Sequence, residues 1–400
     1  MAGRLGTRLV EPDRSEMIPL PEGASLVLLP GRQPVGINRE GCFASLKHQP
    51  GLRSRRPVQA VAALLPQGYT RTLLPGYSRR DGVGTLPFFG YCAVGFKDGA
   101  CWVAARQTDE DHRWNPRFYD REDLAGLIRE RQAEFPGNRV LEQLGRCARE
   151  YSCFTAQNLF YRRWEAGIPV SPACNAGCVG CISLQESECC PSPQQRIGFA
   201  PTMEETAGPA AAHLAEAELG IVSFGQGCEG EPLLRGKDLV QAVRAIRERT
   251  DRGTININTN GSRPEVVREL ARAGLDAMRV SLASANDALY EAYHRPQGYD
   301  LRPVKESIRA AVDAGVRVSL NLLHFPGVTD LPSETEALIE LVRETGLSLI
   351  QVRNLNLDPE VFLGLAPNLD EEPLGVPAFL EVLGEELPGV EIGNYTRPKG

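Results

Sequence analysis

Three cysteines close together near the middle of the chain are the residues that most clearly indicate chemistry. Cys174, Cys178 and Cys181 have the spacing C-x3-C-x2-C, and no fourth cysteine follows at the spacing of a closed metal site. Three thiolates from one short loop can hold three irons of a cubane cluster and leave the fourth iron without a protein ligand. Because catalytic metal sites keep an open position whereas structural sites close it, the loop predicts a catalytic iron–sulfur cluster.

A structural zinc site is the main alternative for these cysteines. Zinc usually takes four ligands, which two C-x2-C pairs can supply. Cys178 and Cys181 form one such pair, but the neighbouring Cys189 and Cys190 make a poor second pair. A non-catalytic zinc-binding adaptor therefore stays open as a hypothesis of a different class.

The composition is that of a globular protein in a reducing compartment. The chain has 400 residues, of which 42% are hydrophobic and 24% charged, as in an ordinary protein of two or three domains. Charges interrupt every apolar run, so we expect no membrane-spanning helix, and the first residues lack the apolar segment of a signal peptide. The 11 cysteines are too sparse for a disulfide scaffold and odd in number, which favours the cytoplasm.

The periodicity of apolar residues divides the chain into four parts. Residues 1–119 contain short apolar runs bounded by Pro and Gly, which predict a β-rich domain with a hairpin turn at residues 97–99. Residues 120–165 have apolar residues at helical spacing and predict a helical connector. Residues 166–360 alternate strands and helices, which predicts an α/β domain with a parallel sheet and crossover helices. Residues 361–400 remain as a C-terminal extension.

The alternating part contains six candidate strands, and the first leads into the cysteine loop. Parallel sheets and barrels gather their chemistry at the carboxyl ends of their strands. The candidate strands are residues 168–171, 220–224, 254–259, 277–282, 317–323 and 349–353, and helices are expected at 237–249, 264–273, 301–314 and 332–345.

Polar side chains recur where these strands end. After the second strand, Gly230 lets the backbone approach a ligand, and Glu231 offers a carboxylate to an ammonium group. The third strand alternates Asn256, Asn258 and Asn260 with Ile and Thr, so one face is lined with amides that need polar partners. The next three strands add polar groups that are expected to point the same way: Arg279, Ser281, Asn321 and Arg353.

Together these features resemble the signature of the radical S-adenosylmethionine (radical SAM) enzymes over residues 166–360. The turn at Glu229 is similar to the Gly-Gly-Glu-Pro motif of the family, although Glu229 replaces its first glycine. The layout of residues 282–330 is similar to that of the molybdenum-cofactor cyclase branch. The resemblance implies a partial (β/α)6 TIM-like barrel, which here would follow the β-rich N-terminal domain.

The resemblance also implies the cofactors. A [4Fe-4S] cluster on Cys174, Cys178 and Cys181 would bind SAM through its open iron and, with one electron from a donor such as flavodoxin or ferredoxin, cleave it to a 5′-deoxyadenosyl radical. That radical would abstract a hydrogen atom from a small-molecule or peptidic substrate. Glu231 would hold the methionine amine, and Ser281 matches a family serine near the SAM ribose or carboxylate. The residues expected to bind SAM are Gly230, Glu231, Asn258, Asn260, Arg279, Ser281, Asn321 and Arg353.

The N-terminal domain leaves the choice of partner open. Residues 1–100 carry 13 Lys and Arg against 7 Asp and Glu. Such an excess can bind a macromolecule, as in an RNA- or protein-modifying enzyme or an activase of a glycyl-radical enzyme. A solvated face is the commoner explanation, so nucleic acid is possible but not favoured. The excess is concentrated in Arg53, Arg55, Arg56, Arg71, Arg79 and Arg80.

Several reactive residues have no assigned role. Cys189, Cys190 and Cys228 are candidates for an auxiliary cluster or a redox pair, or are buried fillers. His294 and His324 are candidates for acid–base work. Because a radical must be shielded from water and a partial barrel has an open side, we expect residues 1–120 over or beside the barrel mouth, helping to select the substrate. We expect the arginine-rich loop at residues 53–56 to be exposed.

Overall fold

A computed structural model describes residues 1–48, 58–110, 113–184, 192–367 and 369–399. The predictions about Arg53, Arg55, Arg56, Cys189 and Cys190 lie outside these described residues. Within them, no helix combines the length and the apolar character needed to cross a bilayer.

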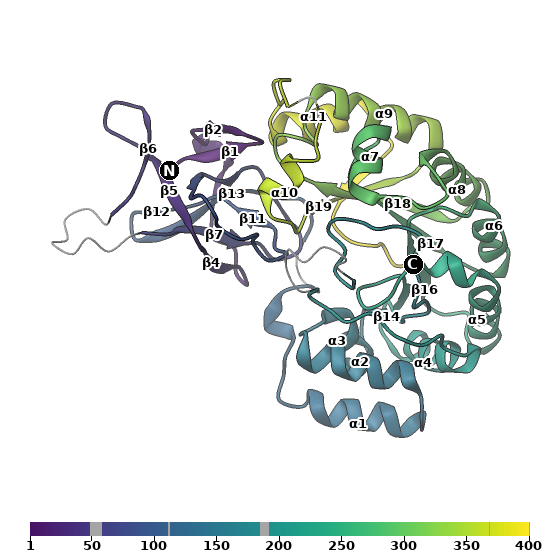
Figure 1. Cartoon of the computed structure of the whole chain (residues 1–400). Helices are drawn as coiled ribbons and strands as arrows, with labels where there is room; N and C mark the ends of the chain where they lie inside the picture. Colours follow the sequence, from purple (N-terminus) through teal and green to yellow (C-terminus); the bar gives the residue numbers. More distant parts are fainter. Residues whose placement is uncertain (49–57, 111–112, 185–191, 368, 400) are drawn as a thin grey trace.

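A parallel sheet in chain order is the centre of the fold (Figure 1). The described chain contributes seven strands to it, and the first and last are not paired with each other, so the curved sheet is a partial barrel. This confirms the predicted fold class. The strands are β14 (Glu165–Gly167), β15 (Ile221–Phe224), β16 (Thr254–Thr259), β17 (Ala277–Leu282), β18 (Arg317–His324), β19 (Leu349–Asn354) and β20 (Glu391–Gly393).

Helices cover the outer face of this sheet (Figure 1). Their apolar stripes explain why: α6 buries Pro264, Val267, Leu270 and Ala273, which recur every three residues on one side of the helix. Residues on this side join the large core that also contains the sheet's outward side chains. The helices after β14 are α4 (Met203–Glu216), η3 (Pro232–Arg235), α5 (Gly236–Arg249), α6 (Pro264–Ala273), α7 (Asp287–His294), α8 (Leu301–Asp313), α9 (Pro332–Thr345), α10 (Pro359–Leu363) and α11 (Val376–Glu386).

The first strand lies earlier in the chain than the sequence pattern predicts. The expected strand was residues 168–171, whereas β14 ends at Gly167. The backbone N–H groups of Val170 and Ser171 donate to the carboxylate of Glu229 at 2.7 and 3.1 Å instead of to a neighbouring strand. The Glu229 side chain therefore ends the pairing of the first strand, and the chain continues into the cysteine loop.

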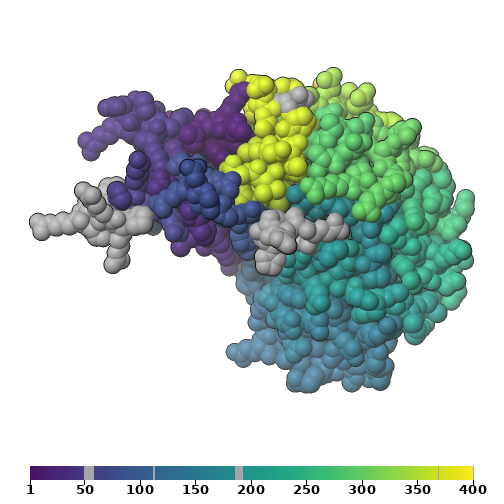
Figure 2. All heavy atoms as spheres, viewed as in Figure 1, coloured from purple at the N-terminus to yellow at the C-terminus, as the bar shows by residue number. Residues whose placement is uncertain are grey.

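The C-terminal part adds a strand that the pattern did not predict. β20 pairs in parallel with β19, and Asn394, just after it, donates its backbone N–H to Asp109 at 2.9 Å. Figure 2 shows residues of the C-terminal part, in yellow, between the N-terminal strands and the rest of the barrel. β20 therefore belongs to the barrel sheet.

The N-terminal part is β-rich, as predicted, with its strands paired antiparallel in small sheets. The expected hairpin is present: β12 pairs with β13 through a turn in which Asp98 and Gly99 have positive φ angles of 53° and 81°. The described strands are β1 (Gly3–Leu5), β2 (Arg8–Val10), β3 (Met17–Pro19), β4 (Ser25–Leu29), β5 (Arg32–Ile37), β6 (Phe43–Ser45), β7 (Ala60–Leu64), β8 (Tyr69–Arg71), β9 (Leu74–Pro75), β10 (Tyr77–Arg79), β11 (Tyr91–Cys92), β12 (Val94–Lys97) and β13 (Ala100–Gln107), with short 3-10 turns η1 (Arg14–Glu16) and η2 (Pro116–Phe118).

Three helices connect this β-rich part to the barrel. They are α1 (Leu124–Glu134), α2 (Arg139–Glu150) and α3 (Phe154–Tyr161). Their buried residues belong to the same core as the barrel helices, and they lie beside β14 and α4 in Figure 1.

Buried arginines fasten the N-terminal strands to the barrel. Arg71 is fully buried and donates to the carbonyl oxygens of Tyr91 and Leu355 at 3.2 and 3.0 Å, so the basic-surface interpretation is wrong for this residue. Arg32 is equally buried and pairs with Asp358 at 2.8 Å. Because both partners are shielded from water, each depends on the other for charge compensation.

The Arg32–Asp358 pair gives a stability prediction. Asp358→Asn keeps the side-chain shape but leaves the Arg32 charge unpaired, so we expect the free energy of unfolding to fall by about 3–5 kcal/mol. Urea denaturation followed by circular dichroism measures this change. The exposed pair of Arg268 and Glu306 is the control, because Arg268→Ala should cost less than about 1 kcal/mol. Equal losses in the two variants would contradict the prediction.

Candidate active site

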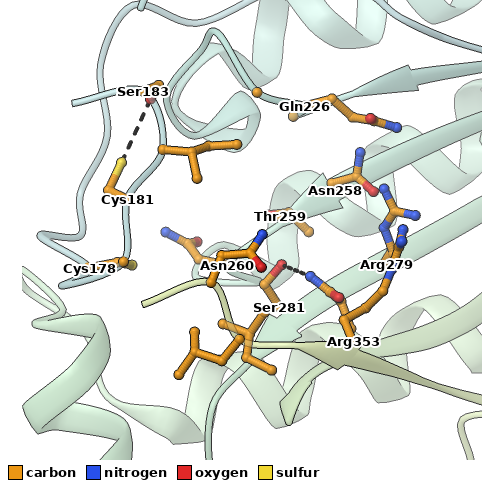
Figure 3. A pocket seen from close by; sticks show the side chains of 18 of the residues that line it. Cys178, Cys181, Ser183, Gln226, Asn258, Thr259, Asn260, Arg279, Ser281 and Arg353 are labelled. Carbon is orange, nitrogen blue, oxygen red and sulfur yellow. Dashed lines mark hydrogen bonds between the residues drawn. The ribbon is translucent and has the colours of Figure 1, made fainter. Parts of the chain in front are cut away.

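A cavity of about 530 Å³ lies at the carboxyl ends of the barrel strands. The cysteine loop and the ends of four strands line it (Figure 3). The Gly-Glu-Pro turn, residues 65–67 and Tyr69 of the N-terminal part complete the lining. The expected position of the N-terminal part beside the barrel mouth thus agrees with the structure. All the predicted ligands line this one cavity: Cys174, Cys178, Cys181, Gly230, Glu231, Asn258, Asn260, Arg279, Ser281, Asn321 and Arg353.

The cysteine loop is held against the end of α7. The backbone N–H of Val179 donates to Tyr293 at 3.0 Å, and that of Gly177 donates to Arg295 at 3.2 Å. Gly180 is required for this approach, because a Cβ at that position would lie 2.4 Å from the Tyr293 hydroxyl. These backbone contacts fix the position of the loop against α7.

The three thiols lie in surroundings that need a positive charge nearby. Burial, followed by repulsion from Cys174 and Cys181, raises the pKa of Cys178 well above its ordinary value. Burial also raises the pKa of Cys174, with a further contribution from Glu231. Metal ligation requires thiolates, and a cationic iron cluster would supply the missing compensation. Among the described residues, no group of three or more Cys, His, Asp or Glu side chains is arranged to hold a single metal ion.

Hydrogen-bond donors reach two of the sulfurs. Arg196 Nη2 donates to Cys181 Sγ at 3.5 Å, and His294 Nδ1 lies 3.4 Å from Cys178 Sγ. The backbone N–H of Ala283 donates to His294 Nε2 at 3.1 Å. Since Nε2 is the acceptor, the proton of the neutral ring must be on Nδ1, where it points to Cys178. Burial lowers the pKa of His294 to about 3, which keeps the ring neutral.

The second histidine singled out by sequence has a different environment. His324 is fully buried and stacks on Phe379 with ring centroids 5.9 Å apart. It does not line the cavity, and burial lowers its pKa to about 3. It belongs to the packing of the barrel wall.

The Gly-Glu-Pro turn lies directly against the cysteine loop. Gly230 donates its N–H to Ser171 at 2.7 Å, and a Cβ there would lie 2.0 Å from the carbonyl oxygen of Ala173, so only glycine fits. The Glu231 carboxylate is buried, which raises its pKa. It accepts three hydrogen bonds: from the Thr259 hydroxyl at 2.5 Å and from the backbone N–H groups of Asn260 and Leu233 at 2.8 and 3.0 Å.

Glu229, which departs from the family motif, has a structural role that sequence reasoning missed. Its carboxylate is buried and accepts four backbone N–H groups, from Val170, Ser171, Gly225 and Gln226, at 2.6 to 3.2 Å. It joins the end of the first strand to the loop after the second strand. Only the three-dimensional path of the two segments brings these donors together, so no local sequence signal could have found them.

The strand-end amides line the floor and sides of the cavity. Asn258 donates to the carbonyl oxygen of Phe224 at 2.9 Å, and Asn260 donates to the side chain of Asn175 at 2.8 Å. Asn321 donates to the Ser281 hydroxyl at 3.0 Å (Figure 3). Asn256 is fully buried and does not line the cavity, so the third strand contributes two of its three predicted amides.

Two arginines, the buried Arg279 and the partly exposed Arg353, lie on the side of the cavity away from the cysteines (Figure 3). Arg279 donates to Thr396 at 3.0 Å, and its nearest carboxylate is Glu165 at 3.7 Å. Arg353 donates to Gln67 at 2.7 Å and to Asn394 at 3.4 Å. Sequence reasoning missed both amides, because they come from segments without a recognisable pattern.

Cys228 is a packing residue. Cys228 is buried in the main core and does not line the cavity. It lies beside Cys147, and this contact together with burial raises its pKa far above the ordinary range. The structure therefore favours the filler interpretation over a second cluster at this position.

Comparison with known proteins agrees with this geometry. Residues 168–342 match the family model of the radical SAM superfamily. The chain is 30% identical over 187 residues to a probable GTP 3′,8-cyclase of Aeropyrum pernix, which covers 46% of this chain and 48% of that relative. It is 36% identical over 127 residues to a probable GTP 3′,8-cyclase of Thermococcus kodakarensis, covering 31% and 39%. The chain thus spans about half, or less, of the length of these curated relatives.

Among solved structures, the crystal structure of HydG, a maturase of the [FeFe]-hydrogenase, has a TM-score of 0.41 at 18% identity and covers 69% of this chain and 66% of its own. That similarity is too low to support a functional comparison. The family model and the sequence relatives carry the assignment, and they agree with the predicted resemblance to the cyclase branch rather than with a zinc adaptor. Residues 168–342 therefore carry the similarity to the radical SAM superfamily, and the activity of the whole chain is a proposal.

Proposed function

We propose that Cys174, Cys178 and Cys181 hold a [4Fe-4S] cluster and that the enzyme uses it to cleave SAM reductively. The observation that carries this proposal is the meeting of the three thiols and the Glu231 turn at one cavity on the carboxyl ends of the strands. When bound and reduced, the cluster supplies one electron to SAM, which yields methionine and a 5′-deoxyadenosyl radical able to take a hydrogen atom from a substrate.

Glu231 is suited to the amino group of SAM. A carboxylate has about four lone-pair positions, and three of them are used by Thr259, Asn260 and Leu233. The free position lies on Oε2, which accepts only from Asn260. One ammonium N–H can occupy it, and its charge would offset the cost of burying the carboxylate. Gly230, Asn258, Asn260, Ser281 and Asn321 are proposed to complete the SAM site.

The N-terminal part is proposed to exclude water from the reaction. Residues 65–67, after β7, line the cavity, and Gln67 binds Arg353 directly. A radical confined in this space is protected from solvent hydrogen donors. We further propose a small molecule or a peptide segment as substrate, a flavodoxin or ferredoxin as electron donor, and the reducing cytoplasm as location.

A docking function for the basic N-terminal part has less support. Arg4, Arg32 and Arg71 count toward the basic excess but are buried in contacts with barrel residues. They cannot contribute to a phosphate-binding surface. An activase or RNA-modifying role is therefore the second choice.

The cluster assignment predicts the iron content of variants. Anaerobically reconstituted protein should bind about four irons and four sulfides for a cubane, and Cys178→Ala should lose most of both. Iron and sulfide analysis with electron paramagnetic resonance (EPR) of the reduced protein measures this. Cys42→Ala is the matched control, since Cys42 is exposed and remote from the cavity lining. Stoichiometric zinc that iron cannot replace would contradict the proposal.

The role of Glu231 predicts a loss of SAM affinity. Glu231→Gln removes the charge-assisted contact to the amine, so the dissociation constant should rise by about 10- to 100-fold for a loss of 1.5–3 kcal/mol. Calorimetric titration with SAM under anaerobic conditions measures it, and iron analysis checks that the cluster remains. Glu334→Gln is the control, because Glu334 is a buried carboxylate outside the cavity. Unchanged affinity in Glu231→Gln would place the amine elsewhere.

The His294 contact predicts a shift in reduction potential. An N–H donor to a ligating sulfur stabilises the reduced cluster, so His294→Leu should make the midpoint potential more negative. His294→Asn, whose amide can replace the Nδ1 donor, should recover part of the difference. EPR-monitored redox titration of reconstituted protein measures both values. Identical potentials in the wild type and both variants would show that the N–H does not act on the cluster.

A further inference from the structure

Two guanidinium groups share one side of the cavity. Arg279 comes from β17 and Arg353 from β19, and both line the space that also contains the cysteine loop. Figure 3 shows them together on the side opposite Cys178 and Cys181, with Asn260 and Ser281 between. Two like charges held this close inside a protein repel each other unless an anion lies near them.

The protein supplies one carboxylate for these two charges. Glu165 lies 3.7 Å from Arg279 Nη2, and Ser223 donates to the same carboxylate at 2.7 Å. Arg353 contacts the amide oxygens of Gln67 and Asn394. Across the described residues, no carboxylate lies within ion-pair distance of Arg353. This side of the cavity therefore has an excess positive charge.

The contacts also leave donors directed at the cavity. Both hydrogen bonds that Arg353 donates to described residues come from Nη1. Its Nη2 and Nε have no acceptor among these residues and are available to a ligand. A guanidinium with two free N–H groups on one edge matches the two oxygens of a carboxylate or phosphate. Burial and the nearby Arg279 both lower the pKa of Arg353, to about 10, and a bound anion would relieve this cost.

SAM is poorly placed to provide that anion. The carboxylate of its methionine is attached to the same carbon as the amine, so both must lie close together. If Glu231 holds the amine, Asn260, whose backbone N–H binds Glu231, marks this position, and Figure 3 shows Asn260 on the cysteine side of Arg279 and Arg353. The sequence analysis assigned Arg279 and Arg353 to SAM, and the geometry favours a different ligand.

We propose that Arg279 and Arg353 bind an anionic group of the substrate, a carboxylate or a phosphate, and so hold the reacting carbon between themselves and the cysteine loop. The role of this group as part of the substrate rests on the proposed function. The existence of the anion site rests only on the contacts of the two arginines. Gln67 and Asn394 orient Arg353, so the N-terminal and C-terminal parts of the chain both shape this end of the site.

Anion binding to the reconstituted protein tests the inference. Calorimetric titrations with inorganic phosphate, pyrophosphate and succinate, each with SAM present and without reductant, should show saturable binding of at least one probe. Succinate binding alone indicates a carboxylate substrate, and phosphate or pyrophosphate binding alone indicates a phosphorylated one. Arg353→Gln should raise the dissociation constant of the probe by at least about tenfold, because one charge-assisted contact is lost.

Further variants keep the test decisive. Arg353→Lys retains the charge but loses the paired donors, so it should give an intermediate affinity even if Arg353→Gln folds poorly. Arg268→Gln, on the exposed surface, should bind like the wild type. Absence of binding by every probe, equal binding by Arg353→Gln, or displacement of the probe by SAM would overturn the inference. The titrations contain no reductant, so they measure anion binding independently of SAM cleavage. If the probe binds but no 5′-deoxyadenosine forms when reductant is then added, the proposed function is rejected and the anion site is kept.

Discussion

The buried carboxylate of Glu229 is the interaction on which the site depends. Its four backbone donors come from the segment that follows the first strand and from the loop that follows the second. A carboxylate in this position cannot stay buried without such donors. By holding both segments, it places the cysteine loop against the Gly-Glu-Pro turn, where Glu231 donates its backbone N–H to Ala173 at 2.8 Å. The cluster and the SAM amine are proposed to meet at this junction.

The register of the parallel sheet then sets the layers of the cavity. Asn258 is in register with Arg279, and Ser281 with Asn321, so polar side chains from neighbouring strands lie at matching heights. Side chains on one strand that point inward are two residues apart. Arg279 therefore lies one layer deeper than Ser281. Arg353 pairs with Leu323, two residues beyond Asn321, so its backbone lies one layer nearer the strand ends than Ser281.

Sequence predicts the regular elements well and the contacts between distant segments poorly. β16 and α6 have their predicted bounds, because the strand is a continuous β-forming run and the helix begins at Pro264 and ends before Gly274, whose φ is 110°. β20 has three residues, too few for a periodic signal. The burial of Arg71 and the positions of Gln67 and Asn394 are decided by tertiary packing, which no local pattern records.

The two ends of the cavity have opposite requirements, and the fold meets them with different parts of the chain. Next to the cysteines, the Glu229 carboxylate is fully used by backbone donors, and Glu231 keeps one acceptor position. The two negative charges there suit a cationic iron–sulfur core and an ammonium group. At the other end, Arg353 is positioned by Gln67 and Asn394, from outside the segment that carries the superfamily match. If the proposed substrate contact of Arg353 holds, substrate choice can change through the terminal parts while the cysteine loop and its supporting carboxylates stay the same.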